Sequence, residues 1–192
     1  ETDTLRMVAA GFFKTLETDN YDFAGADDGL IKKLNTDYRV VHPLALNSPA
    51  LSVDFFGASS FKSEQLKELE KVKNNIVTLS LNKMPVTDKD LEQIAAFKNL
   101  RKLNLSFTSI TGATLNELKK LTDLRQLSLS GTKVKAADIE SLKNLDKLSS
   151  IYLWNTAISE NDLAGLKTKF PKANIEKGFY GDTIMARLNA PL

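Results

Sequence analysis

The chain offers few side chains that could perform catalysis. It has a single histidine, His42, and no cysteine, so a nucleophile–base pair would have to join His42 to a serine or a carboxylate. His42 precedes Pro43 inside the apolar run VVHPL, which is typical of a histidine at a strand end or in a cap. The zinc-protease, nucleophile-elbow, Walker A and dinucleotide-binding motifs do not occur in the sequence. We therefore expect a non-enzymatic protein with no catalytic residue and no cofactor.

Two carboxylate clusters, Asp88–Asp90 and Glu160–Asp162, have the residue types of a metal site. Each cluster falls at the start of a predicted helix, where negative charge complements the helix dipole. A calcium loop would need oxygen ligands at alternating positions, and neither cluster provides them. No metal ligand is therefore predicted.

The overall composition is that of an ordinary globular chain. Its 192 residues carry 26 Lys and Arg against 24 Asp and Glu, and 42% of them are apolar. The cations are interleaved with acids and lack a row of stacking aromatics, so nucleic-acid binding is not expected. No apolar run reaches the ~18–20 residues of a membrane span, so membrane insertion is not expected either.

The elements that must position any site come from an internal repeat of 24 residues that starts at Ile76. Seven apolar positions define it, and in the first block they are Ile76, Leu79, Leu81, Val86, Leu91, Ile94 and Phe97. The same positions are apolar in the three blocks that follow, which start at Leu100, Leu124 and Leu148. Alternation at the start of a block indicates a short strand, and the later spacing of three indicates a helix. Such units bury their apolar faces only by stacking in register.

The pattern L-x-x-L-x-L-x-x-T-x-I-T, followed by L-x-x-L-x-x-L, resembles a leucine-rich repeat. The usual Asn is replaced by Met84, Thr108, Thr132 and Thr156. This Thr variant is similar to bacterial repeats found C-terminal to c-type cytochrome domains in cell-envelope proteins. The resemblance implies an α/β fold: a right-handed βα solenoid with parallel strands on the concave face and short helices on the convex face. It also implies a bacterial periplasmic or cell-surface location.

The chain divides into four parts on this basis. Residues 1–23 are expected to form an N-terminal helix and linker, and residues 24–75 a cap of degenerate repeats. Residues 76–171 hold the four regular repeats, and residues 172–192 a further strand and a C-terminal cap.

Hydroxyl residues occupy the expected helix starts in three of the four repeats. Thr87, Thr111 and Ser159 are predicted to be helix N-caps, whereas the third repeat has Lys135 at this position. The helix of the third repeat should therefore open most easily.

Strand side chains that point away from the core form ladders across the stacked repeats. One predicted ladder is Thr78, Lys102, Gln126 and Ser150, and the next is Ser80, Asn104, Ser128 and Tyr152. The candidate binding residues on this concave face are Lys102, Asn104, Gln126, Ser128, Tyr152 and Trp154. Trp154 has two interpretations: a ligand contact, or a side chain covered by the C-terminal segment around Phe179 and Tyr180. Phe107 is expected to pack within its turn.

The sequence thus favours an interaction module that binds a protein or a cell-surface polymer through its concave face. The alternative is a structural spacer or accessory domain of a larger periplasmic, cytochrome-containing protein. A monomer is expected, and the sequence does not identify the ligand.

Overall fold

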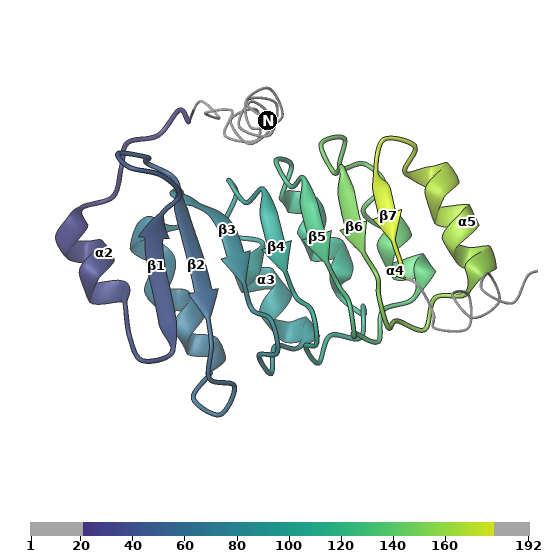
Figure 1. Cartoon of the computed structure of the whole chain (residues 1–192), viewed down its shortest axis with the longest axis horizontal. Helices are drawn as coiled ribbons and strands as arrows, with labels where there is room; N and C mark the ends of the chain where they lie inside the picture. Colours follow the sequence, from purple (N-terminus) through teal and green to yellow (C-terminus); the bar gives the residue numbers. More distant parts are fainter. Residues whose placement is uncertain (1–20, 179–192) are drawn as a thin grey trace, which may run out of the picture.

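The computed structural model describes residues 21–178, which build one seven-stranded sheet whose strand order follows the chain (Figure 1). The strands are β1 (Arg39–Pro43), β2 (Leu51–Phe55), β3 (Ile76–Ser80), β4 (Lys102–Asn104), β5 (Gln126–Ser128), β6 (Ser150–Tyr152) and β7 (Asn174–Glu176). The pair β1–β2 is antiparallel, and every later pair is parallel. The predicted helix in residues 1–23 and the predicted cap around Phe179 and Tyr180 lie outside the described residues.

Most of the helices form a second layer behind the sheet, and the first and the last of them flank its two ends (Figure 1). They are α2 (Asp28–Leu34), η1 (Ser63–Val72), η2 (Asp88–Asp90), α3 (Leu91–Ile94), η3 (Leu115–Lys120), α4 (Ala136–Glu140) and α5 (Glu160–Lys169). Several are 3-10 helices, because apolar residues three apart line up along one side when a turn contains three residues. Leu115 and Leu118 of η3 are buried in this way.

The strand register confirms the 24-residue repeat. Leu79 pairs with Leu103, Leu103 with Leu127, and Leu127 with Ile151. Leu105 and Leu129 are fully buried, and the backbone N–H of Leu105 donates to Ser128 of the next repeat. One continuous apolar core therefore runs through all the repeats, as stacking units require.

A ladder of threonines replaces the asparagines of the usual repeat pattern. The hydroxyls of Thr108, Thr132 and Thr156 donate to the carbonyl oxygens of Leu105, Leu129 and Leu153, at 2.7, 2.6 and 2.8 Å. All three threonines are buried, so these bonds satisfy carbonyls that water does not reach. The turn after each strand is held in this way.

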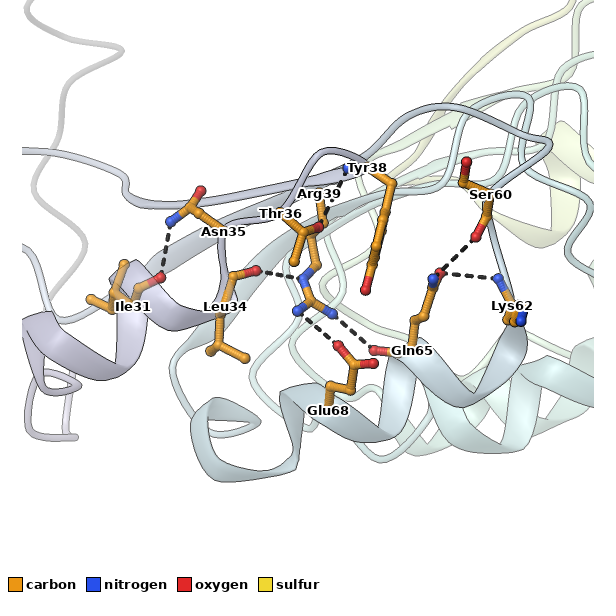
Figure 2. A network of polar contacts seen from close by, with 10 residues as sticks. All are labelled: Ile31, Leu34, Asn35, Thr36, Tyr38, Arg39, Ser60, Lys62, Gln65 and Glu68. Atoms are coloured by element: carbon orange, nitrogen blue, oxygen red, sulfur yellow. Dashed lines mark hydrogen bonds and ion pairs between the residues drawn. The ribbon is translucent and has the colours of Figure 1, made fainter.

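A buried arginine ties the N-terminal cap together (Figure 2). Arg39 is only 1% exposed, and its guanidinium donates to the carbonyl oxygens of Leu34 and Gln65 at 2.8 and 3.1 Å. A third bond reaches the carboxylate of Glu68 at 3.0 Å, and the ring of Phe55 lies 5.5 Å from the guanidinium carbon. The donors of Arg39 thus join β1 to α2 and η1, and its contact with Phe55 adds β2.

The free edge of β1 is blocked along its whole length. The side chain of Asn35 accepts from the N–H of Val41 and donates to its carbonyl oxygen, at 2.9 and 3.0 Å. Arg39 bonds to the backbone of Thr36 in both directions, and Pro43 has no N–H to offer. This edge therefore cannot accept a further strand.

The helix starts follow the prediction at two of three hydroxyl residues. Ser159 caps α5, since its hydroxyl oxygen accepts from the N–H of Asp162 at 3.1 Å. Thr87 is the N-cap of η2, but its hydroxyl donates a hydrogen bond instead of accepting one. Its N–H and hydroxyl both donate to the Asp90 carboxylate.

Thr111 is not a helix N-cap, contrary to the prediction. Its N–H and hydroxyl both donate to the carboxylate of Asp88 in the preceding repeat, and η3 begins only at Leu115. Gly112, with a φ of 101°, donates to the same carboxylate at 2.9 Å. The bonds to Asp88 tie this segment to the preceding repeat, and a turn at residues 113–114 comes before the helix.

Candidate functional site

The face of the sheet opposite the helix layer carries the predicted ladders, and we call it the strand face. Thr78, Lys102, Gln126 and Ser150 stand side by side on successive strands, and so do Ser80, Asn104, Ser128 and Tyr152. The next residues along the two ladders, Asn174 and Glu176, belong to β7. The register that the repeat predicts is therefore the register observed.

A hollow of about 320 Å³ lies on this face over β3, β4 and β5. Its lining includes five of the six candidate binding residues: Lys102, Asn104, Gln126, Ser128 and Tyr152. Asp54 also lines the hollow and escaped the sequence analysis, because β2 precedes the regular repeats and is out of step with them. Asp54 can be recognised as part of the second ladder only once β2 is aligned with β3, which pairs Asp54 with Ser80.

The sixth candidate residue, Trp154, lies outside the hollow and contacts Phe107. The two rings meet edge to face, with centroids 5.8 Å apart, although the residues belong to repeats that are not adjacent. Trp154 is 49% exposed and Phe107 is 41% exposed. We expected Phe107 to pack within its own turn, whereas this contact reaches a repeat further along.

Glycines form the floor beneath these two rings. A Cβ atom placed on Gly131, in the repeat between them, would lie 2.4 Å from Cδ1 of Phe107. A Cβ atom on Gly178 would lie 2.4 Å from Cδ1 of Trp154. Any larger residue at either position would displace the ring above it.

The same turn position has left-handed backbone in all four regular repeats. The φ angles are 62° at Lys83, 57° at Phe107, 68° at Gly131 and 55° at Asn155. This conformation lets the N–H of Phe107 donate to Ser130 and that of Gly131 donate to Trp154, both at 2.7 Å. It costs a non-glycine residue on the order of 1 kcal/mol, least for asparagine.

The hollow offers hydroxyl and carboxamide groups, several of them with unused hydrogen-bonding capacity. The Asn104 side-chain oxygen accepts from the N–H of Ser106 at 3.0 Å, and the hydroxyls of Ser106 and Ser128 share a bond of 2.6 Å. Within residues 21–178, the side chain of Gln126 makes no hydrogen bond and is only half-buried. A ligand could bind to these groups without displacing a buried partner.

His42, Asp54 and Ser52 lie together at the β1–β2 end of the strand face, but not in the order that catalysis needs. The Ser52 hydroxyl donates to the Asp54 carboxylate at 3.2 Å, and Nε2 of His42 lies 3.9 Å from the same oxygen. The serine proton is thus held by the acid instead of the base, so the serine is not activated. In the described part of the chain, no group of three His, Asp or Glu side chains could hold a metal ion.

Charge is sparse and balanced around the hollow. Asp54 and Lys102 line it with one charge of each sign, and Glu176 follows Tyr152 on the ladder.

Among the described residues, no helix is both long and apolar enough to cross a membrane.

No protein-family model matches the sequence, and no curated protein matches it. Among solved structures, an internalin C2 from Listeria monocytogenes aligns with 27% identity and a TM-score of 0.46, over 56% of this chain and 43% of that one. A second Listeria internalin aligns with 15% identity and a TM-score of 0.38, over 59% of this chain and 44% of that one. A Leptospira interrogans LRR protein aligns with 20% identity and a TM-score of 0.40, over 61% and 34%.

The chain spans less than half the length of each of these structures. The 24-residue strand register, the continuous apolar core and the helix layer behind one mostly parallel sheet define its fold. This chain is a leucine-rich-repeat solenoid.

Proposed function

We propose that this chain is a non-enzymatic interaction module that binds its ligand, a protein or a cell-surface polymer, through the strand face. The observation that carries the proposal is the gathering of five predicted binding residues around one hollow. Open hydroxyl and carboxamide groups there adjoin strands that end in an exposed aromatic pair. Polar groups beside exposed Tyr and Trp are typical of recognition surfaces.

The arrangement around His42 supports a non-enzymatic role. Catalysis by acyl or group transfer needs a base that accepts the proton of the nucleophile. The Ser52 hydroxyl is hydrogen-bonded to Asp54 instead, and Ser52 itself is buried.

The alternative is a spacer or accessory domain in a larger periplasmic protein that carries a cytochrome. A spacer would cover its aromatic side chains with neighbouring segments, whereas Trp154 and Phe107 are each exposed by two-fifths or more. Their exposure favours the interaction module. The periplasmic or cell-surface location and the monomeric state are part of the proposal and rest on the resemblance of the repeats.

The proposal is tested by arrays of bacterial surface proteins and glycans probed with two double variants. Gln126→Ala with Ser128→Ala alters the hollow, and Asn116→Ala with Lys119→Ala alters exposed positions of η3 on the helix side. We expect the first variant to lose the array signals of the wild type and the second to keep them. Signals lost only with the helix-side variant would contradict the proposal.

A further inference from the structure

We infer that the Phe107–Trp154 pair and the neighbouring hollow bind a neutral, hydroxyl-rich polysaccharide chain. This inference rests on the proposed function, since it names the ligand of the same strand face. It starts from an oddity in the backbone: Phe107 is a large aromatic residue held at a φ of 57°.

Backbone preference does not explain the choice of phenylalanine at this position, and packing against Gly131 and Trp154 leaves a large part of the ring uncovered. The equivalent residue is lysine at 83, glycine at 131 and asparagine at 155; glycine and asparagine tolerate left-handed backbone best, and Phe107 is the one aromatic residue among the four. Phe107 also leaves 41% of its surface exposed, so much of its apolar area contributes nothing to the core. A strained, exposed aromatic side chain points to contact with a ligand.

The rings are also held in place before any ligand arrives. Phe107 lies over Gly131 and Trp154 lies over Gly178, and neither floor would admit a Cβ atom. The edge-to-face contact at 5.8 Å then fixes the two rings against each other. A preformed surface of this kind binds with little loss of side-chain entropy.

The chemistry around the rings separates a sugar from a protein partner. The buried core of a protein–protein interface is mainly apolar and is depleted in Ser, Asp and Lys. Here the side chains that line the hollow next to the rings are hydroxyls and carboxamides, as at Gln126, Ser128 and Tyr152. A sugar ring presents apolar C–H groups on its face and hydroxyls around its edge. The C–H groups suit the negative faces of aromatic rings, and the hydroxyls suit side chains that both donate and accept.

Charge and length narrow the ligand further. Asp54 and Lys102 cancel each other in the hollow, so a polymer with a charge on every unit has no complementary row of opposite sign. Adjacent strands are ~4.8 Å apart, so the ladders from β3 to β6 extend over roughly 14 Å. That is longer than one sugar ring, which favours a chain over a monosaccharide.

The test uses Trp154 as its own reporter, because it is the single tryptophan of the chain. Soluble neutral polysaccharides (a β-glucan, a mannan and a galactan) are titrated into the full chain, with polygalacturonate as a charged comparison, while Trp154 emission is recorded. We expect a saturable change with at least one neutral polymer and none with polygalacturonate.

Three variants identify the site. Phe107→Asn installs the residue that the chain already uses at the equivalent position 155, so the turn should keep its left-handed backbone. We expect it to weaken binding about tenfold while the thermal midpoint stays the same or rises. Phe56→Ala removes a phenylalanine of similar exposure, 43%, from the other end of the sheet and should leave binding unchanged. Trp154→Ala, followed by affinity electrophoresis in gels that contain the polymer, should abolish retardation.

The outcomes separate this inference from the proposed function. If no neutral polymer binds, or if Phe107→Asn binds as the wild type does, the polysaccharide inference is overturned. If a surface protein is then found whose binding Gln126→Ala with Ser128→Ala abolishes, the proposed function stands with a protein ligand. If neutral polymers bind and only the helix-side variant loses them, both the inference and the proposed function fail.

Discussion

The carboxylate of Asp88 accepts hydrogen bonds from both the backbone N–H and the hydroxyl of Thr111, at 2.9 and 2.8 Å, across the boundary between two repeats. Burial raises the pKa of the Asp88 carboxyl, but the bonds from Thr111 and Gly112 outweigh it and hold the pKa below its usual value of 3.8. The charged carboxylate is therefore one of the groups that join the first regular repeat to the second.

This contact predicts a pH dependence of stability. Because the folded-state pKa is lowered, the contribution of Asp88 is complete above the ordinary pKa and is lost as the pH falls through the folded-state value. We expect Asp88→Asn to lower the free energy of unfolding by about 1 kcal/mol at pH 7. The difference from the wild type should shrink between pH 5 and pH 3, as urea denaturation at several pH values would measure. A difference independent of pH would refute this role, and exposed Asp146→Asn is the control.

The threonine ladder predicts that the hydroxyl of each threonine contributes more to stability than the size of the side chain does. Thr132→Val keeps the shape of the side chain but removes the hydroxyl bond to the buried carbonyl of Leu129, which then keeps only the longer bond, 3.2 Å, from the backbone N–H at position 132. We expect a loss of about 1–2 kcal/mol in the free energy of unfolding. Thr122→Val, at an exposed position, should change it by less than about 0.5 kcal/mol. Equal effects of the two substitutions in chemical denaturation would contradict this account.

The stacked core predicts a large cost for truncation at its centre. Leu127 is fully buried and pairs with Leu103 and Ile151, so Leu127→Ala should cost about 2–5 kcal/mol. Lys102→Ala, on the strand face, should cost far less. The unfolding midpoints of the two variants are compared, and similar midpoints would contradict the central, buried position of Leu127 in the stack.

The helix start of the third repeat should gain stability from a side-chain cap. Lys135 precedes α4 without a side-chain cap, whereas Ser159, the equivalent residue of the next repeat, caps α5. Half of a capping arrangement is already present, because the N–H of Lys135 donates to Asp138 at 2.8 Å. Lys135→Ser should therefore stabilise the chain by about 1 kcal/mol and slow amide exchange in α4. Exposed Lys133→Ser should do neither, and slow exchange of α4 in the wild type would argue against the prediction.

The sequence predicts the sheet register and the core well, because one apolar column recurs every 24 residues and a slip would expose it. It predicts the 3-10 helices and the role of Thr111 poorly. A spacing of three suits more than one kind of turn, and the bond from Thr111 to Asp88 depends on how two repeats stack. The register likewise brings five of the candidate residues together around one hollow.

The contact between Phe107 and Trp154 could not be predicted from either residue alone. It arises because the repeat between them has glycine at the equivalent position, which leaves space for the ring of Phe107 to lie over Gly131 and contact Trp154. Comparing the column Phe107, Gly131 and Asn155 would have revealed the gap. Asp54 was missed for a different reason, since β2 joins the sheet with a register shift.

Because the outer edge of β1 is blocked, the sheet cannot be extended by a further strand on that side. The side chain of Asn35 occupies the place of a neighbouring strand, and Pro43 closes the remainder. Additional repeats could therefore be inserted only on the C-terminal side of β1. Two molecules likewise could not extend one another by joining at this end, which protects the chain from indefinite head-to-tail polymerisation at high local concentration.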